Sequence, residues 1–310
     1  MKIKTIACVG AGLVGQGWVT LFSAKGYDVL LHDLDEETLQ ASVQKIQSNL
    51  EFMEKNRLLK TGASKIAINK LITTTNLADA VSRADYIQES VQDDPELKKQ
   101  VFKEIDADSK EDAIIASSAS GLLMSEIQTA TRYPSRCVLA HPMLPVHLIP
   151  LVEIVGGDLT SPETVSSAYE FMKSLGKTPV LLKKEVSGYI VNRLQAALVR
   201  EAFDLIASGV ANAKDVDKAF CSGIGLRDPF IGPLLRVHLA GNGIERFIKN
   251  YKKSYEKRWE SMADWTSIPV KTADSVIKSV KELPQIQSQS MEEIKAWRDD
   301  QLIKMLKILI

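Results

Sequence analysis

The sequence predicts an α/β protein in which a doubly wound, mainly parallel sheet is followed by an all-α C-terminal domain. Short runs rich in β-branched residues alternate with helical segments from residue 3 to about 182, as in parallel sheets that carry helices on both faces. A glycine-rich turn follows the first run, and strand patterns stop after Lys184. We therefore expect a first domain over residues 1–185 and a second over residues 186–310, each long enough to bury a core.

Composition narrows the class of protein. The 310 residues carry 39 Lys and Arg against 39 Asp and Glu, so the net charge is zero. A balanced charge gives no basic field for nucleic acid or an anionic membrane, and no apolar run is long enough to span a bilayer, so we expect neither partner. The chain has three cysteines, Cys8, Cys137 and Cys221. They are too far apart in sequence for a metal-binding motif or a disulfide framework, which predicts a cytoplasmic protein without a metal site.

Eight runs in the first domain have the length and composition of strands. They cover residues 5–9, 28–32, 70–74, 86–88, 113–116, 136–140, 151–155 and 179–182. Residues 36–69 lie between the second and third strands and are too long for one crossover helix, so a helical hairpin fits them. Asp94-Pro95 and Ser161-Pro162 each place an N-cap side chain before a proline at the first helical position, which predicts that helices begin there.

The second domain carries only helical patterns. These cover residues 190–207, 213–222, 231–255 and 272–281. A last helix runs from Ser290 through Met305, and Glu293 follows Ser290 at the spacing of a capping box. Residues 282–290 contain Pro284 and three glutamines, which predicts a loop. Gly188 permits the turn between the two domains.

The glycine-rich turn has the spacing of a dinucleotide-binding motif. Gly10 allows a tight turn after the first strand, Gly12 lets the backbone approach a pyrophosphate, and Gly15 lets helix and strand pack closely. The helix that follows runs to Lys25. The glycines alone would also suit a plain strand-to-helix turn, but their position between a strand and a helix favours a Rossmann-type site.

Two further features specify the dinucleotide. Backbone N–H groups at the start of the helix, around Leu13 and Val14, would hold the pyrophosphate at the positive end of the helix dipole. Asp33 ends the second strand, where its carboxylate can accept hydrogen bonds from ribose hydroxyls and would repel a 2′-phosphate. We therefore predict NAD as the cofactor.

A histidine and a glutamate are the candidates for acid–base chemistry. Oxidation of an alcohol needs a base for the hydroxyl proton, and histidine titrates near neutral pH. His141 follows the strand at 136–140, at a carboxyl end where open α/β sheets place ligands, whereas His32 is assigned to the cofactor side. Glu153 interrupts an apolar run and needs a partner if it is buried, and an imidazole would suit. An ordinary loop histidine and a solvent-facing glutamate are the alternative.

Four ordered motifs carry a resemblance to a known family. They are residues 10–15, residues 116–121, residues 141–145 continuing through 151–153, and residues 188–193. In this order they resemble the 3-hydroxyacyl-CoA dehydrogenase superfamily over nearly the whole chain. The resemblance implies an N-terminal Rossmann domain, a helical C-terminal domain that forms a homodimer, and NAD-dependent oxidation of a hydroxyl group.

The same resemblance implies roles for single residues. His141 and Glu153 would form the catalytic pair, while Ser120 and Asn192 would hydrogen-bond the reacting oxygen and position the nicotinamide. Glu89 would lie on the cofactor side. Taken without the resemblance, Ser120 would only begin a turn and Asn192 would only cap a helix. One position departs from the family: Leu144 replaces the usual asparagine after the histidine, which removes any hydrogen bond made there.

Within the superfamily the chain resembles a short, single-function branch that includes L-carnitine dehydrogenases and the lambda-crystallins, which are similar to L-gulonate 3-dehydrogenase. The motifs that carry this resemblance are residues 88–90, 120–122, 147–153, 225–227 and 230–233. A small L-3-hydroxy acid is therefore the expected substrate.

The candidate substrates differ in the side chains they require. A trimethylammonium group would bind against aromatic rings, which are available at Tyr251, Tyr255, Trp259 and Trp265. A sugar acid would want a cation, available at Arg227 or Arg236. A 3-hydroxyacyl-CoA such as 3-hydroxybutyryl-CoA would want basic residues, available at Lys55, Arg57, Lys60 and Lys65. A non-catalytic, NADH-binding crystallin-like protein is the remaining alternative.

Overall fold

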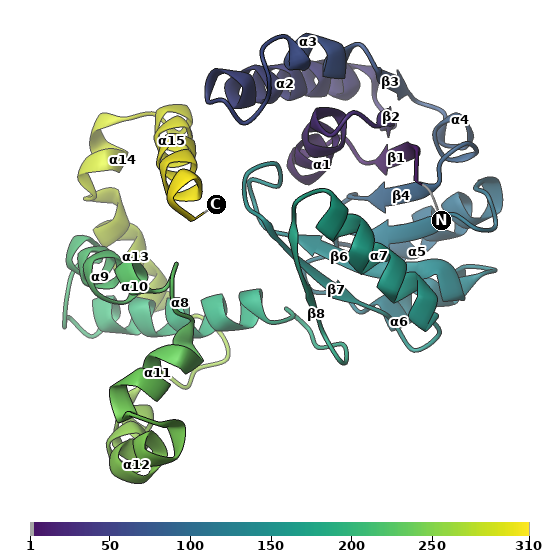
Figure 1. Cartoon of the computed structure of the whole chain (residues 1–310). Coiled ribbons are helices and arrows are strands. Elements are labelled where there is room, and N and C mark those ends of the chain that lie inside the picture. Colours follow the sequence, from purple (N-terminus) through teal and green to yellow (C-terminus); the bar gives the residue numbers. More distant parts are fainter. Residues whose placement is uncertain (1–2, 310) are drawn as a thin grey trace. The chain divides into compact units, whose positions relative to one another are not determined.

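The chain divides between Asn192 and Arg193 into an α/β unit and a helical unit (Figure 1). This is a computed structural model, and it describes residues 3–309. The class of each unit confirms the predicted fold: strands occur only in the first, and the second consists of helices. The division falls a few residues after the boundary expected at residue 185. None of the helices within residues 3–309 has the length and apolarity needed to cross a membrane.

Eight strands form one sheet in the order β3-β2-β1-β4-β5-β6-β7-β8. All neighbouring strands are parallel except β6 and β7. The strand order reverses between β1 and β4, which creates a crevice at their carboxyl ends, where doubly wound sheets bind ligands. The strands are β1 Thr5–Val9, β2 Asp28–His32, β3 Leu71–Thr74, β4 Tyr86–Glu89, β5 Ile114–Ser117, β6 Cys137–Pro142, β7 Leu151–Val155 and β8 Thr178–Leu181.

Helices cover both faces of the sheet because alternate strand residues point to opposite sides. One buried cluster joins the sheet to α1 Leu13–Ala24, α2 Glu36–Lys55, α3 Ala63–Ile68 and α7 Pro162–Ser174. The other joins it to α4 Leu77–Val81, α5 Pro95–Asp108 and α6 Met124–Ile127. Helices α2 and α3 form the helical hairpin expected within residues 36–69.

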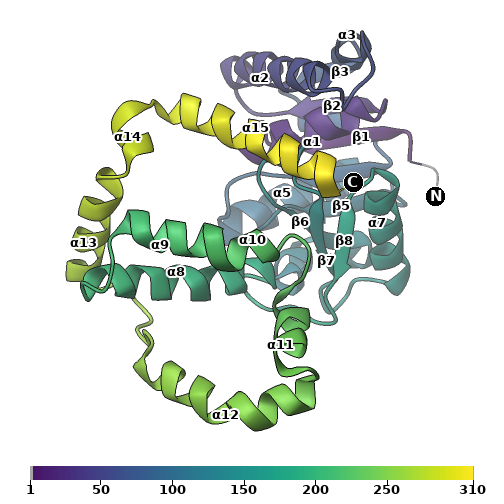
Figure 2. The same ribbon diagram turned by 60° about the vertical axis from the view of Figure 1, so that its left-hand side comes forward.

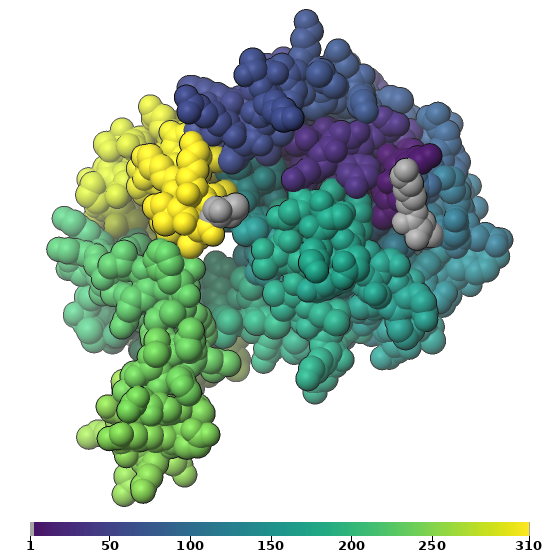
Figure 3. Space-filling model, viewed as in Figure 1, coloured from purple at the N-terminus to yellow at the C-terminus, as the bar shows by residue number. Residues whose placement is uncertain are grey.

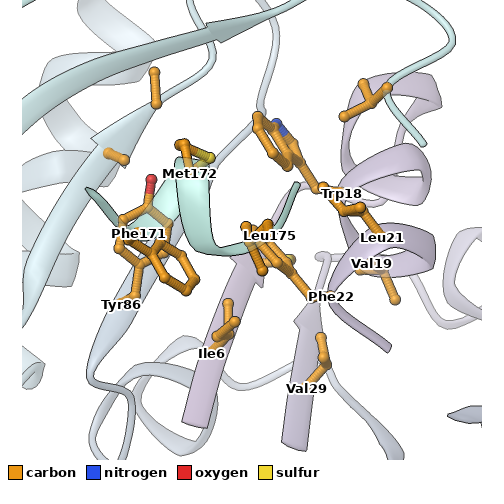
Figure 4. Packing of buried hydrophobic residues seen from close by; sticks show 14 of the residues in the cluster. Ile6, Trp18, Val19, Leu21, Phe22, Val29, Tyr86, Phe171, Met172 and Leu175 are labelled. Atoms are coloured by element: carbon orange, nitrogen blue, oxygen red, sulfur yellow. The ribbon is translucent and has the colours of Figure 1, made fainter. Parts of the chain in front are cut away.

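Aromatic rings fill the first of these two clusters (Figure 4). Trp18 and Phe22 of α1 stack with their ring centroids 5.3 Å apart, and Phe171 of α7 lies 4.7 Å from Tyr86 of β4. All four side chains are almost completely buried, so this cluster fixes α1 and α7 against the sheet. Because α1 follows the glycine-rich turn, the same packing fixes the position of that turn.

The predicted helix starts are confirmed in the α/β unit. Asp94 accepts a hydrogen bond from the Leu97 N–H at 2.8 Å, and Ser161 accepts one from the Thr164 N–H at 3.1 Å. Each cap satisfies a backbone donor that the first helical turn leaves without a partner.

The helical unit is built from α8 onwards (Figure 2). Its elements are α8 Val191–Ala207, α9 Ala213–Ala219, a π-helical turn at Phe220–Ile224, α10 Gly225–Arg227, α11 Pro233–Gly241, α12 Ile244–Ser261, α13 Val270–Lys281, α14 Pro284–Ser288 and α15 Met291–Leu309. Helices α11 and α12 project away from α8, α9 and α13 in both ribbon views, and the space-filling view shows the same projection in light green (Figure 3). Few side chains of this unit are buried.

Two expectations for the helical unit were wrong. Residues 231–255 are not one helix, because Asn242 and Gly243 adopt φ values of 52° and 125°, which no helix allows. Residues 282–290 are not only a loop, because Pro284 starts the short helix α14, where its missing N–H costs no helical hydrogen bond. The capping box was correct: Ser290 and Glu293 exchange backbone and side-chain hydrogen bonds of 2.8 and 3.3 Å.

Candidate active site

The carboxyl ends of the parallel strands bring the predicted site residues to one edge of the sheet. Gly10 follows β1, Ser120 lies just beyond β5, and His141 lies near the end of β6. Ser90, which was not predicted as a site residue, follows β4 at the same edge. These segments are far apart in sequence and meet because β1, β4, β5 and β6 are neighbours in the sheet. This edge is where the fold class places ligands.

The glycines of the turn are required for different reasons. Gly10 has a φ of 99°, and a Cβ there would lie 2.8 Å from the Ser90 carbonyl carbon. A Cβ on Gly15 would lie 1.9 Å from the Gly10 backbone oxygen, so helix α1 and the turn approach each other too closely for any side chain. A Cβ on Gly12 would meet nothing within 4 Å. Gly10 and Gly15 are thus required by the fold, whereas the space at Gly12 is open to a ligand.

A cavity of about 610 Å³ adjoins this turn and is lined by Gly10, Gly12 and Asp33, among others. The Asp33 carboxylate accepts hydrogen bonds from the backbone N–H of Ala11 at 2.7 Å and of Leu34 at 2.8 Å. These bonds hold the Asp33 carboxylate at the cavity wall. A carboxylate has up to four acceptor positions, so Asp33 can still accept hydrogen bonds from the hydroxyl groups of a ligand. The open backbone at Gly12, the carboxylate and the cavity together fit the dinucleotide that the sequence predicts.

Leu13 and Val14 follow Gly12 at the start of α1 and are not among the residues that line this cavity. Leu13 begins α1 with its side chain 64% exposed, and Val14 packs against the buried cluster, so their contribution would come from the first backbone N–H groups of the helix. His32 lines the cavity as expected for the cofactor side, but it is buried. Burial lowers the pKa of His32, against the opposing effects of Asp33, the Thr75 backbone and Glu104.

His141 and Glu153 are hydrogen-bonded neighbours in the sheet. They face each other in the antiparallel register of β6 and β7, and His141 Nδ1 lies 2.9 Å from Glu153 Oε2. An ionised carboxylate only accepts hydrogen bonds, so Nδ1 carries the proton and Nε2 is left as the basic nitrogen of the neutral ring. The Tyr189 ring packs 5.1 Å from the imidazole and donates its hydroxyl to the Leu122 carbonyl at 2.7 Å, which holds the imidazole in place.

The second oxygen of Glu153 has partners of its own. Oε1 accepts hydrogen bonds from the backbone N–H groups of Ile190 at 2.8 Å and Val191 at 3.1 Å. Burial would raise the pKa of Glu153, but the hydrogen bonds from His141, Val191 and Ile190 outweigh it and hold that pKa below its usual value. The glutamate is therefore a fixed negative charge behind the imidazole.

Ser120 is oriented by an acidic neighbour. Its hydroxyl lies 2.6 Å and its backbone N–H 2.9 Å from Asp93 Oδ2, so the serine donates its proton to Asp93 and presents lone pairs elsewhere. Asn192 donates its side-chain amide to the Ser120 carbonyl at 3.1 Å. The structure thus brings Ser120 and Asn192 together, as the sequence suggested, and adds Asp93 to them.

Glu89 lies in the sheet interior and not on the cavity wall. Its carboxylate accepts from the Lys98 ammonium at 2.7 Å, the Ser117 hydroxyl at 2.6 Å and the Val91 N–H at 2.6 Å. Lys98 is also buried and lies 3.2 Å from Asp93 Oδ1. The carboxylate is occupied by protein groups in this structure, and a cofactor contact for Glu89 stays a prediction.

Three residues that hold the site residues in place were not predicted from the sequence. Asp93 and Lys98 connect Glu89 to Ser120, and Tyr189 packs on His141. Asp93 stands directly before the recognised N-cap at Asp94, which was the one available signal. Lys98 lies on a helix whose lysines look solvent-facing in sequence, and its burial depends on the sheet packing around it.

The candidate substrate-binding residues lie on several separate elements of the fold. Tyr255 and Trp259 follow each other along α12 with their rings 5.6 Å apart, and the Arg258 guanidinium already lies over the Tyr255 ring at 4.1 Å. Arg236 is paired with Asp228 at 2.6 Å. The basic residues of the α2–α3 hairpin are all exposed: Lys55, Arg57, Lys60 and Lys65. Leu144 lies on the loop after β6 and is 45% exposed.

Comparisons with known proteins cover the whole chain. The family described as "3-hydroxyacyl-CoA dehydrogenase, NAD binding domain" matches residues 5–186, and its "C-terminal domain" matches residues 188–279. The L-carnitine dehydrogenase of Bacillus cereus is 38% identical over 310 residues, covering 99% of this chain and 93% of that protein. The lambda-crystallin homolog of Rattus norvegicus is 32% identical over 307 residues, covering 98% and 95%.

A solved structure has a similar fold. The 5-formyl-3-hydroxy-2-methylpyridine 4-carboxylic acid 5-dehydrogenase, an NAD+-dependent dismutase, superposes with a TM-score of 0.85 at 27% identity and covers 99% of both chains.

Proposed function

Since the chain belongs to the 3-hydroxyacyl-CoA dehydrogenase family and is an NAD-dependent oxidoreductase acting on CH–OH groups, we propose that it oxidises the 3-hydroxyl of a small L-3-hydroxy acid to a ketone. The acid is carnitine-like or gulonate-like. The full-length similarity to L-carnitine dehydrogenases and to lambda-crystallins supports this substrate class over acyl-CoA esters. The observation that carries the reaction is the buried hydrogen bond between His141 and Glu153.

His141 is the general base of this proposal. Its Nε2 takes the proton of the substrate hydroxyl, and Glu153 keeps the proton on Nδ1 and stabilises the imidazolium that forms. Bound NAD supplies the acceptor for the hydride that leaves the substrate carbon. Ser120, whose own proton is donated to Asp93, would accept a hydrogen bond from the nicotinamide amide, and Asn192 supports Ser120.

A substrate panel tests the proposal. NADH formation is followed by absorbance with L-carnitine, L-gulonate and 3-hydroxybutyryl-CoA as separate substrates. We expect the highest kcat/KM for L-carnitine or L-gulonate. Preference for the CoA ester would assign the chain to the acyl-CoA branch, and tight NADH binding without turnover of any substrate would favour the non-catalytic, crystallin-like alternative.

A histidine variant tests the mechanism with a matched control. His141→Ala removes the base and is expected to lower kcat by about 10²- to 10⁴-fold, the usual contribution of general base catalysis. His238→Ala removes an exposed histidine of α11 and should leave kcat unchanged. Full activity of the His141→Ala protein would refute the mechanism while leaving the fold and the cofactor assignment intact.

A further inference from the structure

A chain of hydrogen bonds runs from the buried interior of the sheet to the partly exposed cofactor cavity. It begins at Tyr86 in β4, passes through Gln88 and Ser118, and ends at Ser90, which lines the cavity with Gly10 and Gly12. The catalytic mechanism uses none of these four side chains. Their hydrogen-bond directions follow from counting donors and acceptors.

Tyr86 sets the direction at the buried end. Its hydroxyl is fully buried and donates to Gln88 Oε1 at 2.9 Å, the acceptor that the structure gives it. If the Gln88 amide were flipped, its NH₂ group would face the phenol, and the phenol proton would lose this acceptor, at the cost of an unsatisfied buried donor. Burial, and next the nearby Cys8, raise the pKa of Tyr86 well above its usual value, so the phenol keeps the proton that it donates.

This orientation of Gln88 settles the role of Ser118. With Oε1 turned to Tyr86, Gln88 Nε2 donates to Ser118 Oγ at 2.8 Å, and the Trp18 indole N–H donates to the same atom at 3.0 Å. A serine hydroxyl has two lone pairs and one proton. Both lone pairs of Ser118 are therefore occupied, and its proton must go to its third neighbour, Ser90 Oγ, at 2.9 Å.

Ser90 accordingly accepts from Ser118 and keeps its own proton for another acceptor. We propose that Ser90 is a cofactor-binding residue whose hydroxyl donates to a ribose or phosphate oxygen of the bound dinucleotide. Ser90 is only partly buried and lies at the crevice between β1 and β4. Its backbone lies directly against Gly10 of the dinucleotide turn. The inference depends on NAD binding and not on the identity of the hydroxy acid.

A binding experiment without substrate tests this role. NADH affinity is measured by calorimetric titration for the wild type, for Ser90→Ala and for Ser48→Ala, which removes an exposed hydroxyl on α2. One lost hydrogen bond should weaken NADH binding about three- to tenfold in Ser90→Ala, and Ser48→Ala should bind like the wild type. A folded Ser90→Ala protein, verified by thermal unfolding, that binds NADH as the wild type does would overturn the proposal.

A double-mutant cycle tests the direction of the chain. Tyr86→Phe removes the donor that fixes Gln88, so the amide can turn, accept from Ser118 and draw the Ser90 proton back towards Ser118. We expect Tyr86→Phe to weaken NADH binding about two- to fourfold, and to have no further effect in the Ser90→Ala background. An equal effect in both backgrounds would mean that Tyr86 acts only through packing, and would overturn the directed chain.

Discussion

Glu153 has two tasks, since one carboxylate oxygen binds His141 and the other binds the first N–H groups of the segment at Ile190 and Val191. The Glu153→Gln amide has the shape of the carboxylate but not its negative charge. It therefore does not keep the proton on His141 Nδ1 as the carboxylate does. We expect kcat to fall by about 10²- to 10⁴-fold, because the imidazole loses both its tautomer control and its stabilising charge. Steady-state kinetics with the preferred hydroxy acid measure this, and an unchanged kcat would contradict the assigned role.

The difference in unfolding free energy between the wild type and Glu153→Gln should also depend on pH. Folding lowers the pKa of Glu153 below its usual 4.5, so its charged form stabilises the folded protein at pH values above 4.5, and this stabilisation is lost as pH falls through the lowered pKa. At pH 7 the wild type should therefore exceed Glu153→Gln by about 1–3 kcal/mol in unfolding free energy. The difference should shrink on acidification, as measured by denaturant titration at several pH values. A difference that grows in acid would contradict this linkage.

Two glycines of the dinucleotide turn offer a matched comparison. In Gly15→Ala the new Cβ meets the Gly10 backbone oxygen at 1.9 Å, so we expect a loss of about 1–3 kcal/mol in unfolding free energy and weaker NADH binding. In Gly12→Ala the Cβ meets no protein atom, so stability should stay near the wild-type value while NADH affinity falls. Thermal unfolding and NADH titration separate the two effects. Equal stability losses would contradict the distinction between a packing glycine and a ligand-facing glycine.

At the scale of elements, the loop between β6 and β7 is held by Lys177, which precedes β8. Its buried ammonium donates to the carbonyls of Val146 and Ile149, the latter at 2.7 Å. Because this loop joins the strands of His141 and Glu153, Lys177 stabilises the hairpin that carries the catalytic pair. Burial, and next the charge of Lys25, lower the pKa of Lys177 to about 7.

This pKa predicts a pH effect of the same sign as that of Glu153, but in a more alkaline window. Between about pH 7 and the usual lysine value of 10.5 the unfolded chain binds more protons than the folded one, so stability rises with pH. Relative to Lys177→Met, the wild type should gain about 1 kcal/mol per pH unit across this window. Denaturant titrations at pH 7, 8.5 and 10 measure it, with the exposed Lys173→Met as control. A constant difference between the wild type and Lys177→Met would show that Lys177 titrates normally.

Element boundaries were largely predictable from the sequence. Strands β1, β2 and β7 have the expected bounds, because continuous apolar runs and adjacent turn residues define them locally. The break between α11 and α12 was missed although Asn242-Gly243 is a turn signal, because the hydrophobic pattern continues through it. The glycine at position 241 permits the close approach of the two helices at this break, since a Cβ there would lie 2.3 Å from the Phe247 Cβ.

The candidate site was predictable in part for a similar reason. The fold class fixes the order of the strands that contain His141 and Glu153 and of the strand that precedes the glycines. It could therefore be expected that these residues lie close together. Lys98 and Asp93 could not be assigned, because only the assembled sheet shows that Lys98 is buried against Glu89. The catalytic and cofactor roles of all these residues stay predictions until the variants are measured.

At the scale of the whole molecule, the helical unit leaves large apolar side chains in solvent. Leu234 is 78%, Phe230 64% and Trp259 63% exposed, and such concentrations of apolar surface are typical of protein–protein interfaces. We therefore expect a homodimer that covers these side chains. Sedimentation should give twice the chain mass of 34.2 kDa, and Leu234→Glu should shift the protein to the monomer. A monomeric wild type at micromolar concentration would contradict this expectation.

The reversed direction of β7 has a consequence for how the enzyme matures. His141 and Glu153 are only 12 residues apart, on the two arms of one hairpin, whereas parallel neighbours would need a long crossover between them. Closing a short loop loses little chain entropy, and contacts local in sequence form early in folding. The hydrogen bond between His141 and Glu153 can therefore form within a single short stretch of nascent polypeptide, before residues farther along the chain add their contacts.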